Sequence, residues 1–263
     1  MFLRLRSLAL RFAAVGTVTI AAPSQAAAAP PTPTEHAASV PDTSRGFALR
    51  LGLSEDAAII GGSDVCSRQS QLESGFACFR ESGSQYHGTP LPGRANKIND
   101  GLSPAATRVL LGLDWSLVAW FAAGLEGGVV FIGGSPRPDG GRRSLPIHLA
   151  GRALIYPAGD AQVANALAFY GLLQFGIREV DGKQSVTVFE DPAALPPPNQ
   201  PDNPPTQTLD AYQRMGSGFF GLGGGLHAPL GSGFGVGAEL SLLRMFPTSG
   251  TGLSLSAALE YEL

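Results

Sequence analysis

The chain has no run of 18 apolar residues after residue 26, although 44% of its 263 residues are hydrophobic. A helix that spans a membrane needs about 20 apolar residues in succession, so spanning helices are excluded there. Charge is also scarce, because charged residues make up only 15% of the chain and just two of them, Lys97 and Lys183, are lysines. The formal net charge of −3 gives no reason to expect nucleic-acid binding.

The N-terminus has the composition of an export signal. Three arginines precede the short apolar run 12–22, and Ser24-Gln25-Ala26 places small residues where a signal peptidase cleaves. We therefore expect 1–26 to be a cleaved signal peptide rather than a membrane anchor. Residues 27–45 are rich in Pro, Ala and Thr and should form a disordered leader. The folded domain is then 46–263.

Cysteine is nearly absent, since the chain contains only Cys66 and Cys78. An even number of cysteines in an exported chain favours a disulfide. A metal site would need further ligands, and His87 is the one candidate nearby. The sequence therefore predicts that the two cysteines close a short loop, and it predicts no metal or cofactor.

Segments with the period of a β-strand fill most of the folded domain. Eight such segments are 46–53, 107–115, 119–132, 144–156, 165–180, 212–226, 233–244 and 252–263. In the last one, every second residue from Leu253 to Leu263 is apolar, whereas Ser254 and Glu260 lie on the other face. A soluble sandwich also alternates, but its polar face would carry many lysines. The pattern predicts an all-β fold, a closed antiparallel up-and-down transmembrane β-barrel of about eight strands.

The connections between these segments alternate in length. Transmembrane barrels have short periplasmic turns and long outer loops. We therefore expect 54–106 to be a long polar outer loop, and the Pro-rich segment 193–208 to be part of another. Short periplasmic turns are expected near 157–164 and 227–232, with both chain ends in the periplasm.

Charged side chains share the inward face of the predicted strands. They are Arg50, Arg108, Asp114, Glu126, His148, Arg152, Arg178, Glu239 and Glu260. An eight-stranded lumen is just wide enough for its own side chains, so four cations and four anions can pair and plug it. Alternating glycines from Gly221 to Gly237 have the same parity and should leave room for the bulky side chains of Trp120 and Tyr156.

Aromatic residues collect on the outward face, near the predicted periplasmic ends of six strands. They are Phe47, Trp115, Phe121, Phe169, Phe234 and Tyr261. Aromatic side chains line the two interfaces of a membrane, so this set is interpreted as one interfacial girdle.

The terminal strand LSLSAALEYEL and the hairpin GFFGLGGGLHAPLGSGFGVGAEL resemble small outer-membrane barrels of the outer-membrane-protein-A and -W type. The resemblance is architectural and covers 46–263. The last residue is Leu263, where such proteins usually have Phe. The resemblance implies the cell outer membrane of a Gram-negative bacterium, with outer-membrane lipid and the barrel-assembly machinery as partners. It implies no activity.

The sequence leaves three functions open. The favoured one is a plugged barrel with a structural or surface-interaction role and an extracellular ligand at the long loops. The second is a narrow gated pore for small solutes. The third is an outer-membrane acyl-hydrolase or acyltransferase in which His87 acts with Ser82 or Ser84 and Glu81 orients it. No Gly-x-Ser-x-Gly motif supports this third function.

Overall fold

The computed structural model describes residues 46–93, 95–136, 146–158, 167–190 and 206–263. The predicted signal peptide and leader lie outside these residues. The elements are β1 (Phe47–Ser63), α1 (Arg68–Glu73), β2 (Phe76–Phe79), β3 (Lys97–Val118), β4 (Phe121–Gly133), β5 (Ile147–Ile155), β6 (Ala168–Ile177), β7 (Asp181–Phe189), β8 (Thr206–Arg214), β9 (Gly218–Gly231), β10 (Phe234–Phe246) and β11 (Thr251–Glu262). None of the helices described is both long and apolar enough to cross a membrane.

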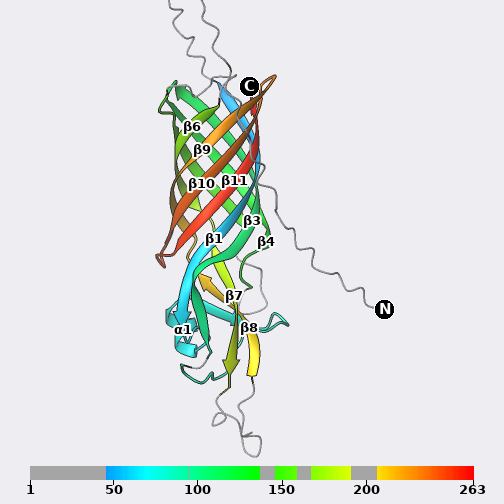
Figure 1. The fold of residues 1–263 in the computed structure, drawn as a ribbon, viewed down its shortest axis with the longest axis vertical. Helices are drawn as coiled ribbons and strands as arrows, with labels where there is room; N and C mark the ends of the chain where they lie inside the picture. Colours follow the sequence, from blue (N-terminus) through cyan, green and yellow to red (C-terminus); the bar gives the residue numbers. More distant parts are fainter. Residues whose placement is uncertain (1–45, 94, 137–145, 159–166, 191–205) are drawn as a thin grey trace, which may run out of the picture. The chain divides into compact units, whose positions relative to one another are not determined.

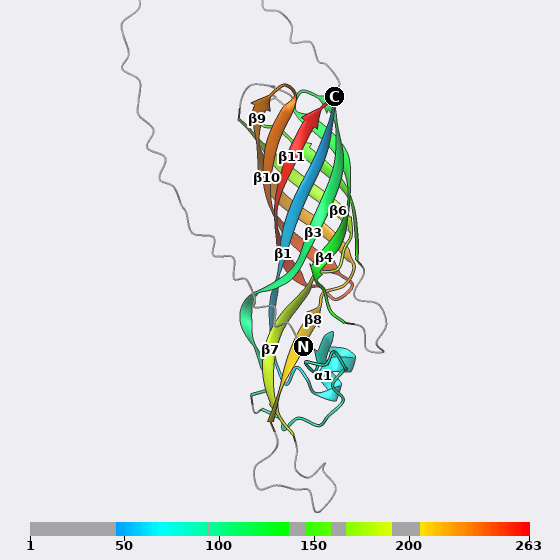
Figure 2. The same cartoon turned by 90° about the vertical axis from the view of Figure 1, so that its right-hand side faces the viewer.

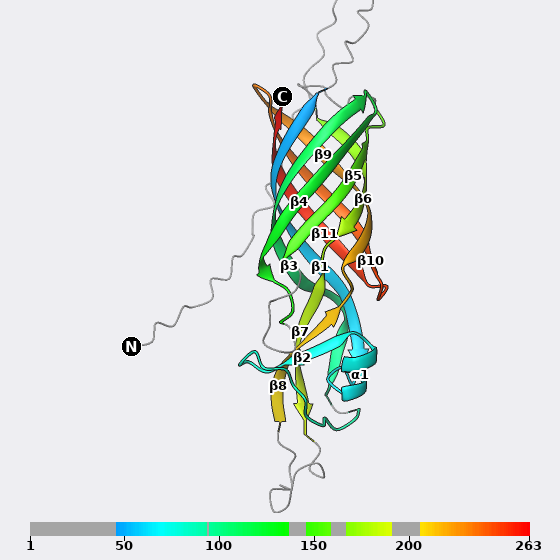
Figure 3. The same cartoon turned by 180° about the vertical axis from the view of Figure 1, so that it is seen from behind.

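Eight of the strands form a closed antiparallel barrel in the order β1-β11-β10-β9-β6-β5-β4-β3 (Figures 1 and 3). The ring closes because β1 pairs with β11 on one side and with β3 on the other. Along β11, for example, Ala48 lies opposite Glu262 and Ile59 opposite Thr251. The prediction of an eight-stranded up-and-down barrel is confirmed. We call the end where β1 begins and β11 ends the terminal end, and the other the distal end.

Side chains of the barrel strands alternate between an apolar outward face and a polar inward face. In β10, Leu240 and Leu242 are exposed, whereas Glu239 and Ser241 are buried. β11 shows the same alternation, with Leu255 exposed. The barrel therefore exposes hydrocarbon and buries charge, the opposite of a soluble protein.

A second, three-stranded sheet in the order β2-β8-β7 lies beyond the distal end of the barrel (Figures 1 and 3). β1 and β3 continue past the barrel, since residues 60–63 of β1 pair with β3 alone (Figure 2). The Asn99 backbone N–H donates to Gln184 Oε1 at 3.0 Å, and the Ser103 hydroxyl donates to the Lys183 carbonyl. These contacts join β3 to β7. We call residues 60–93, 95–104, 181–190 and 206–214 the distal module.

The prediction that the whole of 54–106 is a polar loop is wrong at both of its ends. β1 runs on to Ser63, and β3 already begins at Lys97. The reason lies in the inward face of β1, which continues as Asp56, Ala58 and Ile60, all of them buried. This face changes from polar to apolar, so the strand leaves the charged lumen and enters an apolar core.

The predicted strand 212–226 is also wrong, because the chain changes sheets within it. β8 ends at Arg214 and β9 begins at Gly218. Gly216 has φ of 96° and lies against the Phe246 carbonyl, where a side chain would collide. The preceding segment, expected to be a loop, contains the β7–β8 hairpin. Most of the Pro-rich segment lies outside the described residues.

Two smaller expectations, one about a turn and one about the lumen, fail as well. The turn expected over 227–232 is shorter, because β9 continues to Gly231 and only Ser232 and Gly233 separate it from β10. Trp120, expected to fill the lumen, is 55% exposed in the turn between β3 and β4. Tyr156 does meet Tyr170, with ring centroids 5.3 Å apart.

Glycines on the inward face of β9 and β10 make room for larger side chains. A Cβ placed on Gly225 would lie 2.5 Å from the ring of Tyr170, and one on Gly237 would collide with the Glu260 carboxylate. The Tyr170 ring can therefore extend over β9 to Glu239 only because Gly225 has no side chain.

We predict that Gly225→Val lowers the free energy of unfolding by about 1–3 kcal/mol, the usual result of overpacking. The matched control is Gly171→Val on the outward face, where a Cβ would have the Ile155 carbonyl oxygen, at 3.9 Å, as its nearest neighbour. Urea titration of the folded protein in detergent, followed by tryptophan fluorescence, measures both. Equal losses for the two variants would contradict this account of the lumen.

Candidate functional site

The half of the lumen nearer the terminal end contains an ion cluster centred on Glu239. Arg50 Nη1 lies 2.7 Å from Glu239 Oε1, and Arg152 pairs with the same oxygen. The Tyr170 hydroxyl also donates to Glu239, at 2.7 Å. Arg152 Nη1 lies 2.9 Å from Glu126 Oε2. We call this group, with Asp114 and Glu260, the proximal ion cluster.

The two remaining carboxylates complete the proximal ion cluster. Asp114 Oδ1 lies 3.1 Å from Arg152 Nε, and Glu260 Oε1 lies 3.1 Å from Arg50 Nε. Each arginine therefore contacts several carboxylates at once. Such networks hold side chains in one arrangement more firmly than a single pair does.

A second ion cluster lies closer to the distal end and is built on Asp56. Arg178 Nη1 lies 3.1 Å from Asp56 Oδ1, and Arg108 pairs with the other oxygen. Arg178 also donates to the Ser254 hydroxyl at 3.3 Å, and its guanidinium carbon lies 4.4 Å from the centroid of the Phe219 ring. We call Asp56, Arg108 and Arg178 the distal ion cluster.

Two histidines take part in this network. His148 Nε2 lies 3.1 Å from Glu126 Oε1, deep in the lumen. His227, on β9, lies near the terminal end of the barrel, and its Nδ1 is 2.6 Å from Glu260 Oε2. Both histidines therefore contact carboxylates, and neither approaches a serine hydroxyl within the described hydrogen bonds.

All nine charged or histidine residues expected in the lumen point inward, and none is more than 9% exposed. Sequence reasoning missed Asp56 and His227. Asp56 has the same parity as Arg50, but it lies in a segment predicted to be a loop. His227 lies in a segment predicted to be a turn. Continuing the alternation of the strands through these segments would have found both.

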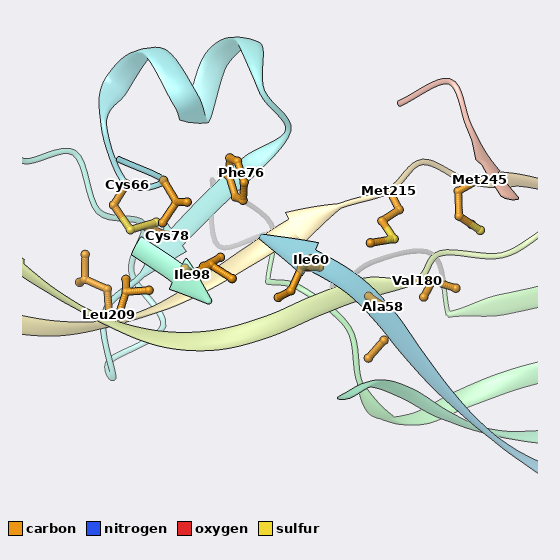
Figure 4. Close-up of a cluster of buried hydrophobic side chains, with 14 of the residues drawn as sticks. Ala58, Ile60, Cys66, Phe76, Cys78, Ile98, Val180, Leu209, Met215 and Met245 are labelled. Carbon is orange, nitrogen blue, oxygen red and sulfur yellow. A yellow bond between two sulfur atoms is a disulfide. The ribbon is translucent and has the colours of Figure 1, made fainter. Parts of the chain in front are cut away.

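An apolar layer lies at the distal end of the lumen. It is formed by Ala105, Ala150, Val180, Met215, Phe219, Leu243 and Met245, all of them buried. These residues belong to one cluster with Ala58 and Ile60 of β1 and with the core of the distal module, part of which Figure 4 shows. The same core therefore extends from the module to the distal end of the barrel.

Aromatic side chains lie on the outward face at both ends of the barrel. Of the six girdle residues, five are exposed and Phe121 is half-buried. Two pairs of them are in contact near the terminal end, Phe47 with Trp115 and Phe234 with Tyr261, with ring centroids 5.7 and 4.8 Å apart. A second exposed set lies in the distal halves of the strands, at Phe131, Phe175, Phe220 and Phe246. The expectation of a single girdle was thus incomplete.

The distal module contains the disulfide. Cys66 and Cys78 are bonded, and both are fully buried. The bond ties the start of α1 to β2. Gln71 of α1 fixes the same loop, because its amide donates to the Cys66 carbonyl at 3.1 Å and accepts from the Cys78 N–H at 3.3 Å.

The residues proposed for acyl-group chemistry do not come together. Ser82 and Ser84 are exposed and hydrogen-bonded to each other at 2.9 Å. His87 instead lines a hollow of about 370 Å³ with Arg68, Gln71, Leu72, Gln85 and Gly88. Among the described residues no group of three or more His, Cys, Asp or Glu side chains could hold a metal ion.

Burial changes the acidity of Tyr86 beside this hollow. Its side chain is fully buried, and burial together with the nearby Glu190 raises the pKa of the phenol well above its ordinary value. Tyr86 therefore belongs, as the neutral phenol, to the buried core of the module.

No protein-family model matches the chain, and no curated protein does. Among solved structures the chain is similar to Ail, the attachment invasion locus protein of Yersinia pestis, with 7% identity and a TM-score of 0.36 over 83% of this chain and 99% of Ail. A second structure, Ail in complex with the heparin analogue sucrose octasulfate, has 7% identity and a TM-score of 0.33 over the same shares of the two chains.

We predict that Glu239→Gln lowers the free energy of unfolding by about 3–5 kcal/mol, because it leaves Arg50 and Arg152 short of a carboxylate inside the protein. The control is Glu73→Gln, which removes the same charge from an exposed side chain of α1 that accepts a hydrogen bond from Gln69. That variant should change stability by less than about 1 kcal/mol. Urea titration in detergent measures the free energy of unfolding of both variants. Similar losses for the two would show that water reaches the proximal ion cluster.

Proposed function

We propose that the chain is an integral β-barrel protein of a bacterial outer membrane, with a closed lumen and a distal module that contacts a partner outside the cell. The observation that carries the proposal is the outward face of the barrel, on which exposed leucine, isoleucine, valine and phenylalanine side chains come from all eight strands. A soluble protein rarely exposes so large a continuous apolar surface. Such a surface is stable in contact with lipid rather than with water.

The spacing of the outward aromatics supports membrane insertion. Phe121 and Phe131 are ten residues apart on β4, which is about 33 Å along a strand. For a strand tilted by about 40°, this corresponds to about 25 Å along the barrel axis, the height of the apolar band of such barrels. Phe234 and Phe246 lie near the two ends of β10 in the same way.

Three successive layers support a closed lumen. A permeating solute would have to pass the proximal ion cluster, the distal ion cluster and then the apolar layer. Exchange of ion-pair partners could loosen the first two layers. It could not open the third, whose side chains have no charges and are shared with the core of the distal module. A structural and interaction role therefore fits better than a pore.

The proposal also assigns the two ends of the barrel to the two sides of the membrane. An even number of strands places the start of β1 and the end of β11 on one side, and the distal module is then on the other. The disulfide is compatible with this assignment, because the cell surface, like the periplasm, is an oxidising compartment. During insertion the barrel-assembly machinery would be a transient partner, and afterwards outer-membrane lipid a permanent one.

A tag inserted after Gly83, in an exposed turn of the distal module, should be stained by antibody on intact cells. A tag inserted after Ser232, in the turn between β9 and β10, should be stained only after the outer membrane is permeabilised. Loss of the protein from membranes in urea alone would show that it is not integral. The reverse staining pattern would contradict the assignment of sides.

Purified protein in planar bilayers should give no steady single-channel current, because the apolar layer has no polar path through it. Unboiled samples must migrate differently from boiled ones on a gel, as a control that the barrel is folded. A stable conductance from such folded protein would refute the closed lumen, while leaving the membrane location intact.

A further inference from the structure

Helix α1 buries none of its six residues. A helix this short is not stable by itself, and helices in proteins are usually held by a packed apolar face. This one is held by other means. The Ser67 hydroxyl accepts from the Ser70 N–H at 3.1 Å, Gln71 bonds the neighbouring backbone, and the disulfide begins one residue before the cap. The chain thus fixes a helix that contributes nothing to the core.

Helix α1 forms one wall of the 370 Å³ hollow. Arg68 and Leu72 come from the helix, and His87 and Gln85 come from the segment after β2. Gln71 forms a fixed floor, because it bonds the carbonyls of Cys66 and Tyr86 and accepts from Cys78 and Gln85. The hollow is therefore built in advance on the disulfide-bonded loop.

The chemistry of the lining indicates an anionic ligand with an apolar part. Arg68 and His87 are the only ionisable residues among the six that line the hollow, and no carboxylate is among them. Within the described part of the chain, neither side chain forms an ion pair. Leu72 is 75% exposed beside them, so an apolar group could cover it. The volume is near the lower limit for ligand pockets, which run from about 300 to 1,000 Å³.

We propose that this hollow binds an acidic peptide segment of a partner protein, with a Glu or Asp carboxylate at Arg68 and His87 and a neighbouring apolar side chain on Leu72. The proposal rests on the surface-interaction role proposed above and names its site and partner class. Arginine binds carboxylates through paired hydrogen bonds, which makes the contact directional. A second ligand class, an acidic sugar, would offer the carboxylate without the aliphatic side chain for Leu72.

The test uses the full-length, disulfide-bonded protein in detergent micelles and two capped peptides, acetyl-Leu-Glu-Gly-amide and its Gln counterpart. Binding is followed by NMR of the imidazole of His87, identified by its loss in His87→Gln. The Glu peptide should bind about tenfold more tightly than the Gln peptide, equivalent to ~1.4 kcal/mol. Arg68→Gln should abolish this preference. Leu72→Ser should weaken the binding of both peptides.

The matched control is Lys97→Gln, which removes one positive charge from an exposed residue of the same module that does not line the hollow. It should keep the full preference. Equal binding of the two peptides by the wild type, or an unchanged preference in Arg68→Gln, would overturn the proposal. So would tighter binding of methyl glucuronide than of the Glu peptide. Because the assay uses purified protein, its result is independent of the tag experiment that tests membrane location.

Discussion

Closure of the hydrogen-bonded ring between β1 and β3 is the constraint on which the rest of the structure depends. Eight strands enclose a lumen just wide enough for side chains, so the inward residues cannot rely on bulk water. Each inward charge must then find its partner inside the protein. The four arginines and five carboxylates that form the two ion clusters meet this requirement.

The inward face changes character along the barrel axis, and this change connects the barrel to its module. On β1 it passes from Arg50 through Asp56 to Ala58 and Ile60, while the alternation of the strand stays the same. A polar lumen therefore becomes an apolar core without any break in the backbone. The distal module is an outgrowth of the barrel wall, and one hydrophobic cluster serves both.

The sequence predicted the barrel and its inward residues well because alternation in a strand is a local property. The alternation of polar and apolar residues within one strand indicates which face is buried, whichever strands it pairs with. The predicted lumen residues, from Arg50 to Glu260, needed only this rule. Asp56 and His227 were missed because the strands were ended too early, at a change of composition that does not end a strand.

The distal module could not be predicted in the same way. β2 has four residues, and β7 is a short strand in which Val186 and Val188 alternate with polar residues. Both depend on pairing with β8, which lies far away in sequence from β2. The distal apolar layer likewise gathers residues such as Val180 and Met215 from links between strands. Contacts of this kind leave no periodic signal.

The continuity of β1 from the barrel into the distal module has a mechanical consequence. Its 17 residues form one strand, bonded to β3 along nearly its whole length and to β11 along its barrel part. A pull on the module directed away from the membrane loads β1 along its own axis. The hydrogen bonds on both sides then share the force instead of opening one after another. Force applied to the module would therefore be carried by the barrel wall itself.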